Sequence, residues 1–213
     1  MGNRRLARRK KGTTAHRPSP IVPGLAAVVF HTPLGWMGLA ASAKGVRAVV
    51  LAKPSRRAVE RALSTRERGT GLRGPRSEVR GKKNPEPRTQ NLEPVLRDAQ
   101  RQVLAYLAGK RHTLDFPIDL SAGTSFQRRV WQTALRIPYG RARSYQWIAA
   151  KVGGKKYSRA VGNALGANPV PLIVPCHRVV AHDASLGGFS GGLTVKRKLL
   201  DLEGTLSQLR RKV

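Results

Sequence analysis

The stretch Asn168-Pro-Val-Pro-Leu-Ile-Val-Pro-Cys-His-Arg178 holds the single cysteine of this 213-residue chain. Its three prolines fix φ and favour extended backbone in the residues before them, so the apolar run Leu172–Val174 is expected to be strand-like. Cys176 is then presented from stiff backbone beside a candidate base, His177, and a fixed positive charge, Arg178, which favours a thiolate. A lone cysteine is also commonly a buried structural thiol, and the residues alone leave both interpretations open.

The composition predicts a polyanionic partner. The chain carries 41 Lys and Arg against 11 Asp and Glu, a formal net charge of +30, which is more than solubility requires. Nucleic acid is favoured over a membrane because no apolar run approaches the roughly 20 residues needed to span a bilayer. Ribosomal or chromatin-like packing is the alternative without chemistry. One cysteine excludes an internal disulfide and a multi-cysteine zinc site, fits a reducing compartment, and leads us to expect no cofactor or metal.

The segment 1–20 contains seven Lys and Arg, no acid and no apolar core. It is therefore not a secretory signal, and we interpret it as a disordered basic arm. An Arg-rich organellar transit peptide is the alternative.

An N-terminal α/β domain is expected at 21–115. Apolar, partly β-branched stretches predict an antiparallel meander at 25–31, 36–41 and 46–51. A short helix is expected at 55–64, and a second helix follows from apolar residues at 3.6-residue spacing between Leu92 and Leu107, ending near Gly109. Between them, 65–90 is rich in Arg, Gly and Pro and is expected to be a mobile basic loop.

A second, mostly α-helical domain is expected at 120–206, followed by a basic tail at 207–213. Ser125 is expected to cap a helix that Pro138 ends, and Ser144 to cap a second helix that runs to Val152. After the turn at Gly153-Gly154, a third helix is expected at 157–167. Helix, glycine turn and helix are the pattern of a helix-turn-helix.

Charge and shape both suggest that this domain binds DNA. No carboxylate lies between Asp119 and Asp183, where ten cations stand, and such a segment is expected to follow phosphates, although a solvated basic face is the alternative. On a helical wheel, small residues of the third helix share one arc opposite Val161 and Leu165: Ala160, Asn163, Ala164 and Ala167. A face this smooth favours sequence-tolerant binding in the minor groove, and packing between helices is the alternative.

The motifs of the chain together resemble one family. Five segments occur in the expected order: Ile137-Pro-Tyr-Gly140, Ser144-Tyr145, Arg159-Ala-Val-Gly162, Pro175-Cys-His-Arg178 and Gly187-Gly-Phe-Ser-Gly-Gly192. The chain resembles the O6-alkylguanine-DNA alkyltransferases from about residue 25 to 204, most densely from 123. The resemblance implies a ribonuclease-H-like α/β domain without catalytic function and a C-terminal domain of the winged helix-turn-helix type. It also implies a stoichiometric methylated-DNA–protein-cysteine methyltransferase, which moves an alkyl group irreversibly to its own cysteine.

The resemblance assigns residues to roles. The catalytic set is Cys176, His177, Glu203 and Tyr145, and Glu203 stands 27 residues after Cys176, as in the family. DNA-binding residues are Arg159, Ala160, Asn163, Ala164, Ser144, Arg128, Lys155 and Lys156. The substrate pocket is assigned to Asn168, Pro171, Val179, Phe189, Ser190 and Arg178.

Several of these roles have ordinary alternatives in the residues themselves. Arg159, the family's intercalating finger, could be a phosphate contact. Tyr145 could be core, and Glu203 could face water at a helix end whose dipole disfavours an anion. Because adjacent side chains on extended backbone point to opposite sides, a water is expected to bridge Cys176 and His177.

The expected partner is duplex DNA carrying O6-alkylguanine, with O4-alkylthymine left open, bound by a monomer in the cytoplasm of a prokaryote or the nucleus of a eukaryote. Phe189 replaces a tyrosine common in the family, and Ser125 a proline. The competing classes are the non-catalytic alkyltransferase-like proteins, which usually have Trp where this chain has Cys176, and a basic architectural protein.

Overall fold

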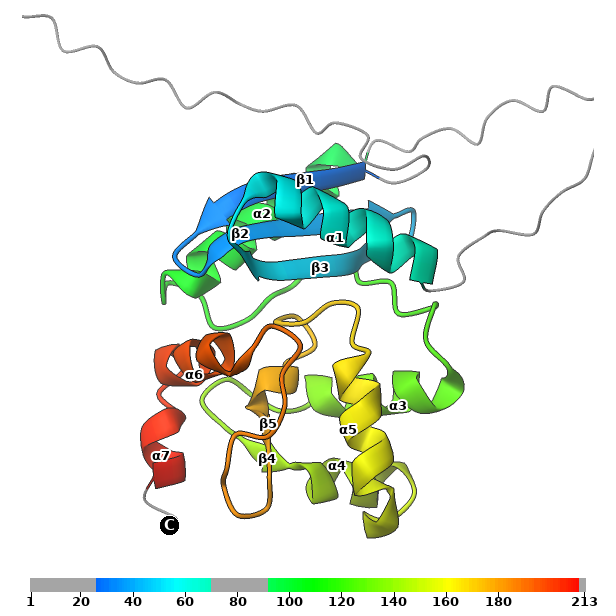
Figure 1. The fold of residues 1–213 in the computed structure, drawn as a ribbon, viewed down its shortest axis with the longest axis vertical. Coiled ribbons are helices and arrows are strands. Elements are labelled where there is room, and N and C mark those ends of the chain that lie inside the picture. Colours follow the sequence, from blue (N-terminus) through cyan, green and yellow to red (C-terminus); the bar gives the residue numbers. More distant parts are fainter. Residues whose placement is uncertain (1–25, 70–91, 211–213) are drawn as a thin grey trace, which may run out of the picture.

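The computed structural model describes residues 26–69 and 92–210. It shows a small sheet with two helices stacked on a group of short helices (Figure 1). The expected disordered arm at 1–20, the part of the expected loop from residue 70 onwards and residues 211–213 lie outside the described residues.

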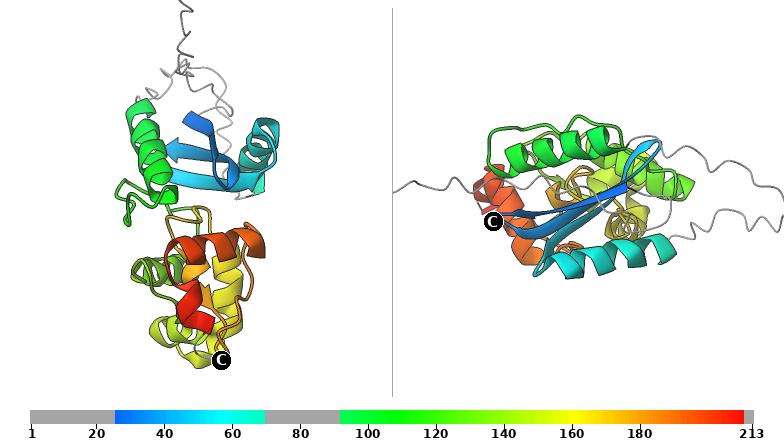
Figure 2. Two further views of the ribbon diagram at one scale, coloured as in Figure 1. Left: turned by 90° about the vertical axis from the view of Figure 1, so that its left-hand side faces the viewer. Right: turned by 90° about the horizontal axis from the view of Figure 1, so that it is seen from above.

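The first half is a three-stranded sheet between two helices. Strands β1 (Ala26–Thr32), β2 (Gly35–Ser42) and β3 (Gly45–Lys53) are antiparallel in this order, which confirms the predicted meander. Helix α1 (Arg56–Gly69) covers one face and α2 (Glu93–Leu107) the other, as the view from above shows (Figure 2). Alternate residues of the strands therefore serve two cores. Met37 belongs to the core beneath α2, whereas Ala40 belongs to the one beneath α1.

Helix α1 is longer than the sequence predicted. The expected loop begins at residue 65, but the helix continues to Gly69. A long-range contact fixes its last turns, because Nη1 of Arg66 donates hydrogen bonds to the carbonyl oxygens of Val49 (2.7 Å) and Pro169 (2.9 Å). Helix α2 ends at Leu107, close to the predicted end near Gly109.

Three helices form the lower part of the second half: α3 (Ser125–Leu135), α4 (Tyr145–Val152) and α5 (Ser158–Gly166). Thr124, and not the expected Ser125, caps α3, because Thr124 exchanges two hydrogen bonds with Gln127 in a capping box. The Ser144 cap of α4 is confirmed, since its hydroxyl accepts from the Trp147 amide (3.1 Å).

The remaining elements close the second half. A 3₁₀ turn η1 (Lys155–Tyr157) precedes α5, a second 3₁₀ turn η2 (Cys176–Arg178) leads into β5 (Val179–Val180), and β5 pairs in parallel with β4 (Arg143–Ser144). Helices α6 (Leu193–Leu202) and α7 (Leu206–Arg210) end the described chain. The first part of the expected basic tail at 207–213 belongs to α7, whose Leu209 packs with Val180 and Leu200.

The proline-rich stretch before Cys176 is a closed turn, so the strand predicted at 172–174 is wrong. Proline restricts its own φ and the residue before it, and Leu172 is neither a proline nor followed by one, so it can adopt its positive φ of 81°. Asn168 holds both ends of the turn. Its Oδ1 accepts from the Val170 amide (3.0 Å), and its Nδ2 donates to the Val174 carbonyl (3.0 Å).

The two halves share one core and several backbone hydrogen bonds. Val46 in β3 bonds the linker through Pro117 and Asp119 (both 2.8 Å), and the Val49 amide donates to the Pro169 carbonyl (2.9 Å). The sheet thereby fixes the loop that carries Cys176. Within 26–69 and 92–210, no helix has the length and apolar character needed to cross a membrane.

Candidate active site

Cys176 opens onto a cavity of about 170 Å³. Only 4% of the residue is exposed. The other lining residues come from α4, α5 and the glycine-rich loop before α6: Tyr145, Gly162, Leu165, Gly166, Gly188, Phe189 and Ser190. The cavity is smaller than the roughly 300–1,000 Å³ of sites for drug-sized ligands. It suits a single flat group that reaches the sulfur atom.

The thiol sits in surroundings that keep it protonated. Burial raises the pKa of Cys176, although an Asn168 hydrogen bond (Nδ2 to Sγ, 3.1 Å) and the charges of Lys196 and Arg66 oppose that rise. A thiol at neutral pH is a weak nucleophile and must lose its proton before it attacks. The site therefore needs a base.

The backbone at the cysteine is a tight turn and not the extended chain that the sequence predicted. Pro175 (φ −80°, ψ 59°) forms an inverse γ-turn in which the Cys176 amide donates to the Val174 carbonyl (2.8 Å). The Arg178 amide then donates to the Pro175 carbonyl (2.9 Å). Consecutive side chains therefore leave η2 in different directions, and Cys176 and His177 face different surroundings.

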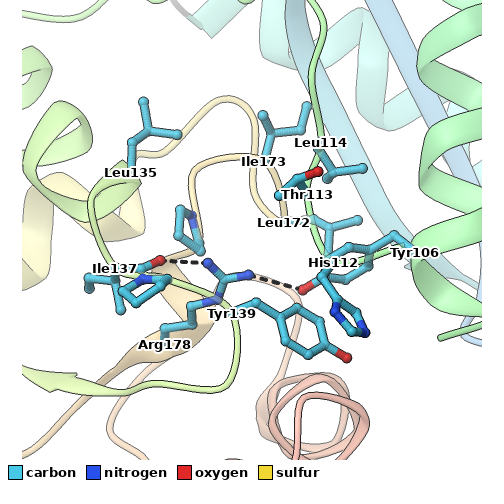
Figure 3. Close-up of a pocket in the computed structure, with 12 residues that line it drawn as sticks. Tyr106, His112, Thr113, Leu114, Leu135, Ile137, Tyr139, Leu172, Ile173 and Arg178 are labelled. Atoms are coloured by element: carbon cyan, nitrogen blue, oxygen red, sulfur yellow. Dashed lines mark hydrogen bonds between the residues drawn. The ribbon is translucent and has the colours of Figure 1, made fainter. Parts of the chain in front are cut away.

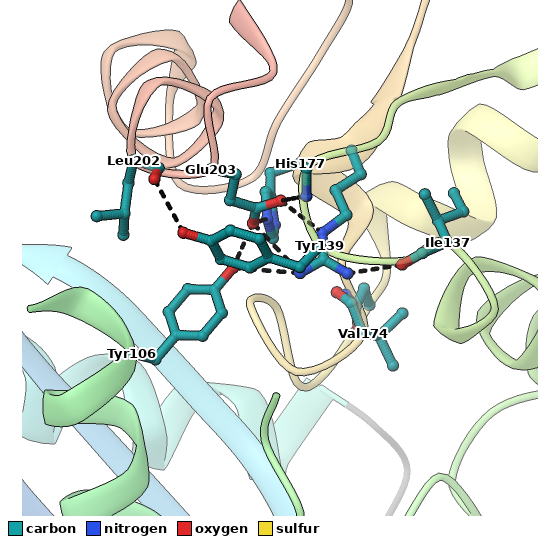
Figure 4. A network of polar contacts seen from close by, with 10 residues as sticks. Tyr106, Ile137, Tyr139, Val174, His177, Leu202 and Glu203 are labelled. Atoms are coloured by element: carbon teal, nitrogen blue, oxygen red, sulfur yellow. Dashed lines mark hydrogen bonds and ion pairs between the residues drawn. The ribbon is translucent and has the colours of Figure 1, made fainter. Parts of the chain in front are cut away.

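His177 faces a buried polar network at the end of α6 (Figure 4). Its Nε2 lies 2.6 Å from Oε1 of Glu203, and both side chains are fully buried. Tyr106 of α2 donates to the same oxygen, and the Gly140 amide reaches Oε2 (3.3 Å). The predicted pairing of His177 with a carboxylate 26 residues away thus occurs, and Glu203 does not face water.

Arg178 belongs to this network and not to the cysteine cavity, so its predicted place in the substrate pocket is wrong. Its Nε donates to Oε2 of Glu203 (2.8 Å), and its Nη1 donates to the Ile137 carbonyl (2.6 Å). Burial by itself would raise the pKa of Glu203, but the bonds from His177, Arg178 and Tyr106 lower it to about 2. Arg178 thus holds Glu203 ionised.

The ionised carboxylate fixes the tautomer of His177. A carboxylate only accepts hydrogen bonds, so Nε2 carries the proton and Nδ1 is the free acceptor. Nδ1 is buried and has no partner among the described residues. Burial lowers the pKa of His177, although Glu203 opposes this effect. The imidazole is therefore neutral at pH 7 and can take up a proton at Nδ1.

Lys196 is the second buried cation at the site, and no role was predicted for it. Its side chain is fully buried on α6, and Nζ donates to the carbonyl oxygens of Val179 (2.5 Å), Gly188 (3.3 Å) and Leu186. Burial lowers its pKa to about 8. The ammonium group thereby fixes the glycine-rich loop that forms one wall of the cavity.

Tyr145, at the first position of α4, also lines the cavity. Its hydroxyl approaches the Gly188 carbonyl (3.4 Å), and burial raises the pKa of Tyr145. Gly187 has a φ of 61°, and a Cβ atom there would lie 2.9 Å from the tyrosine ring. A glycine is therefore required for the loop to pass Tyr145.

Three further pocket predictions have different outcomes. Asn168 touches the sulfur from within the core, where it is 1% exposed. Pro171 lines a neighbouring cavity that it shares with Ser190. Val179 is fully buried in β5 and lines no wall of the cysteine cavity, so its predicted place is wrong.

Exposed cations stand on α3, α4 and α5 and in the segments between them, and α6 adds two more: Arg129, Arg136, Arg141, Arg143, Lys151, Lys155, Lys156, Arg159, Arg197 and Lys198. Arg128 is partly buried and donates to the Gly123 carbonyl, and the hydroxyl of Ser144 is engaged in its helix cap.

The small-residue face of α5 differs in one residue from the prediction. Asn163 and Ala167 are exposed and Ala160 is half-buried, but Ala164 is 3% exposed. Ala164 follows Val161 by three residues and therefore shares its inward face. Trp131 also donates to its carbonyl (2.8 Å). Gly162 and Gly166, on another side of the helix, line the cavity.

A second cavity of about 400 Å³ lies behind the network, where the linker passes the second half (Figure 3). Tyr106 and Arg178 reach its wall, and His112 stacks on Tyr139 there with ring centres 4.2 Å apart.

Sequence reasoning missed Tyr106, Lys196 and Arg66. Two of them could have been noticed in the sequence, because each places a polar group within the apolar face of a helix. Lys196 follows Val195 and precedes Leu199, while Tyr106 follows Val103. A polar side chain on such a face is buried and requires a partner. Its identity could not be read from the helix.

Fold and site together define a two-domain protein in which a cavity ending at a reactive cysteine adjoins a basic, helical surface of the kind that binds DNA. Residues 125–205 match the family model described as "6-O-methylguanine DNA methyltransferase, DNA binding domain". A methylated-DNA–protein-cysteine methyltransferase of Methanosarcina acetivorans is 45% identical over 113 residues, which cover 53% of this chain and 72% of that protein.

Comparison with solved structures points to the same family. The O6-methylguanine methyltransferase of Mycobacterium tuberculosis has a TM-score of 0.63 at 32% identity, over 85% of this chain and 93% of that chain. The same organism's protein in complex with DNA has a TM-score of 0.61 at 33% identity, over 84% and 93%. The chain belongs to the methylated-DNA–protein-cysteine methyltransferase family, the DNA-repair proteins that move an alkyl group onto a cysteine.

Proposed function

We propose that Cys176 is the alkyl acceptor of this protein and that its substrate is O6-alkylguanine in duplex DNA. One observation carries the proposal. The only cysteine of the chain ends a base-sized cavity, and the next residue, His177, is held by a buried carboxylate. A structural thiol needs neither the cavity nor the base.

The damaged base must leave the duplex to reach the sulfur. Extrusion costs a few kcal/mol, which contacts to the flipped base and to the gap must offset. Arg159 is exposed at the start of α5, beside the small residues of that helix, and we assign it to the gap in the base stack. A helix face of Ala160, Asn163 and Ala167 fits the minor groove, where close approach matters more than base-specific contacts.

The transfer is then a nucleophilic displacement at the alkyl carbon. The Cys176 proton passes to Nδ1 of His177 through a bridging water, and Glu203 stabilises the imidazolium. The thiolate attacks the alkyl carbon, a C–S bond forms, and the bond from carbon to O6 breaks with its electron pair going to guanine. Tyr145 supplies a proton to the departing base and is reprotonated from solvent, to which His177 releases the proton that it took from Cys176. The thioether is stable, so one protein molecule repairs one lesion.

Two residues of the glycine-rich loop are placed to hold the base. Ser190 and Phe189 line the cavity. We assign the Ser190 hydroxyl to a hydrogen bond with the O6 edge and Phe189 to an apolar wall. We assign Asn168 to the link between α5 and the cysteine turn, since it bonds both Val170 and Cys176.

The architecture is proposed to follow the family in detail. Residues 21–115 form the ribonuclease-H-like domain and 120–206 the winged helix-turn-helix domain, with α4 and α5 as the paired helices. The protein acts as a monomer, in the cytoplasm of a prokaryote or the nucleus of a eukaryote. Neither a metal nor a cofactor takes part in the proposed reaction.

Mass spectrometry of the Cys176 peptide tests the proposal. After incubation with duplex DNA containing O6-methylguanine, we expect a gain of one methyl group on Cys176 and stoichiometric loss of the lesion. The Cys176→Ala variant should bind the same DNA and leave the lesion intact. Unmodified Cys176 with lesion-bearing DNA bound would assign the chain to the non-catalytic lesion-binding class. Equal affinity for damaged and undamaged duplex would indicate an architectural protein.

A further inference from the structure

We propose that Tyr106, a residue of the N-terminal half, is a positioning residue that sets the proton affinity of the His177–Glu203 pair. The inference rests on the proposed function, because it assigns His177 as the base. It extends that function to a side chain 71 residues before the pair, outside the segment 125–205 that matches the DNA-binding family model.

The hydrogen-bond geometry gives Tyr106 a defined direction of donation. Its hydroxyl oxygen accepts a hydrogen bond from Nη2 of Arg178 (3.2 Å) and contacts Oε1 of Glu203. Arginine can only donate and an ionised carboxylate can only accept, so the phenol hydrogen points at Glu203. Only 1% of the residue is exposed.

Tyr106 and His177 therefore share one oxygen atom. Oε1 of Glu203 accepts from Nε2 of His177 at 2.6 Å and from the tyrosine hydroxyl, while Nη2 of Arg178 approaches at 3.3 Å. Each further donor withdraws charge from the oxygen and weakens its hold on the imidazole proton. Tyr106 thus limits how strongly Glu203 favours the imidazolium form of His177.

Four other groups face the His177–Glu203 pair. Arg178 bonds both carboxylate oxygens, the Gly140 amide bonds Oε2, and Tyr139 and Lys196 face the pair without bonding to it. Burial and the charge of Glu203 raise the pKa of Tyr106 far above its usual range, so the phenol keeps its proton at neutral pH. Among the described residues Tyr106 is the donor to Glu203 that a conservative change can remove without removing a charge.

Removing the hydroxyl should raise the pKa of His177. The imidazole is then protonated, and unable to act as a base, up to a higher pH than in the unmodified protein. In Tyr106→Phe, Glu203 keeps its charge but shares it among fewer donors, so the pKa of His177 rises. The acid limb of the alkyl-transfer rate should then move to higher pH by about one unit, the size of a charged hydrogen bond. At a pH on that limb the rate should fall about tenfold, and at pH 9 it should be close to that of the unmodified protein.

Tyr139→Phe is the matched control. Its hydroxyl also lies at the end of α6 but donates to the Leu202 carbonyl (2.9 Å) and not to the carboxylate. The control should lose a comparable hydrogen bond with no shift of the acid limb. Replacement of Tyr106 by 3-fluorotyrosine, a stronger donor, should move the limb to lower pH.

Two measurements separate this inference from the proposed function. Single-turnover rates on O6-methylguanine duplex, taken across the pH range at saturating DNA, give the acid limb. NMR titration of the His177 ring in the DNA-free protein gives its pKa without any transfer. A higher His177 pKa in Tyr106→Phe supports the inference even if no variant transfers a methyl group, which would overturn only the proposed function. An unchanged His177 pKa, or a rate lowered equally at all pH values, would assign Tyr106 to stability alone and overturn the inference.

Discussion

The two sides of the cysteine turn differ sharply in how their polar groups are satisfied. On the cavity side, Cys176 has one side-chain hydrogen bond, from Asn168, and burial raises its pKa. On the network side, Glu203 accepts from His177, Arg178 and Tyr106 and stays ionised. A thiol that must react is left nearly unpartnered, whereas the carboxylate that must not move is saturated. The 3₁₀ turn η2 separates these environments within three residues.

Removing the negative charge of Glu203 should have the largest effect on the rate of alkyl transfer. In Glu203→Gln the pair loses its charge, so His177 is a weaker base and the rate of alkyl transfer should fall about 10²–10⁴-fold. Arg178 is also left buried without its counter-ion, which costs about 3–5 kcal/mol of unfolding free energy. Single-turnover kinetics on O6-methylguanine duplex and urea unfolding measure the two effects. Asp201→Asn, an exposed acid on the same helix, should match the unmodified protein. An active Glu203→Gln variant would show that the thiol needs no such base.

Removing the ammonium group that supports the cavity wall should have an intermediate effect on the rate of alkyl transfer. Lys196→Met leaves carbonyls of the glycine-rich loop without their buried donor, so stability should fall by about 3 kcal/mol and the rate about tenfold. The control is Lys198→Met, which removes an exposed charge two residues away. The charge of Lys196 also lowers the pKa values of Cys176 and His177, so its loss should raise both and move the pH profile of the rate to higher pH. An unchanged pH profile would assign Lys196 to the support of the loop alone.

A substitution of Arg159 distinguishes an effect on base extrusion from an effect on DNA affinity. If it fills the gap left by the flipped base, Arg159→Ala should lower the rate at saturating DNA about tenfold or more, because extrusion costs a few kcal/mol. If it only contacts a phosphate, affinity should weaken, the salt slope should fall by about one, and the saturated rate should not change. Titrations at 50 and 200 mM salt, together with single-turnover rates, separate the two outcomes. Lys151→Ala is the comparison for a phosphate contact.

The smallest expected effect is on stability against pH. Burial lowers the pKa of His177 below 6.5, so its contribution is complete above that value and is lost as pH falls through the folded pKa. Glu203, with a pKa of about 2, adds a second loss between about pH 4.5 and 2. The slope should not exceed about 1.4 kcal/mol per pH unit for each group. His177→Gln should remove the first step in urea unfolding, and a first step that persists would assign it to another residue.

Much of the fold followed from local patterns. The meander, helix α2 and the Ser144 cap were predicted because side-chain periodicity and capping act over a few residues. The predictions failed where a distant group decides the local conformation. Arg66 extends α1 through the carbonyls of Val49 and Pro169, and Asn168 closes the turn expected to be a strand.

The sequence by itself determined the chemistry that is available: a single thiol, an adjacent imidazole and a basic helical segment. Only the tertiary structure decided what each group faces. It turned Arg178 away from the thiol towards Glu203, buried Ala164, and brought Tyr106 onto a carboxylate 97 residues away. Periodicity reports which face of an element is buried, but buried polar groups take their partners from other elements, and packing alone determines which elements meet.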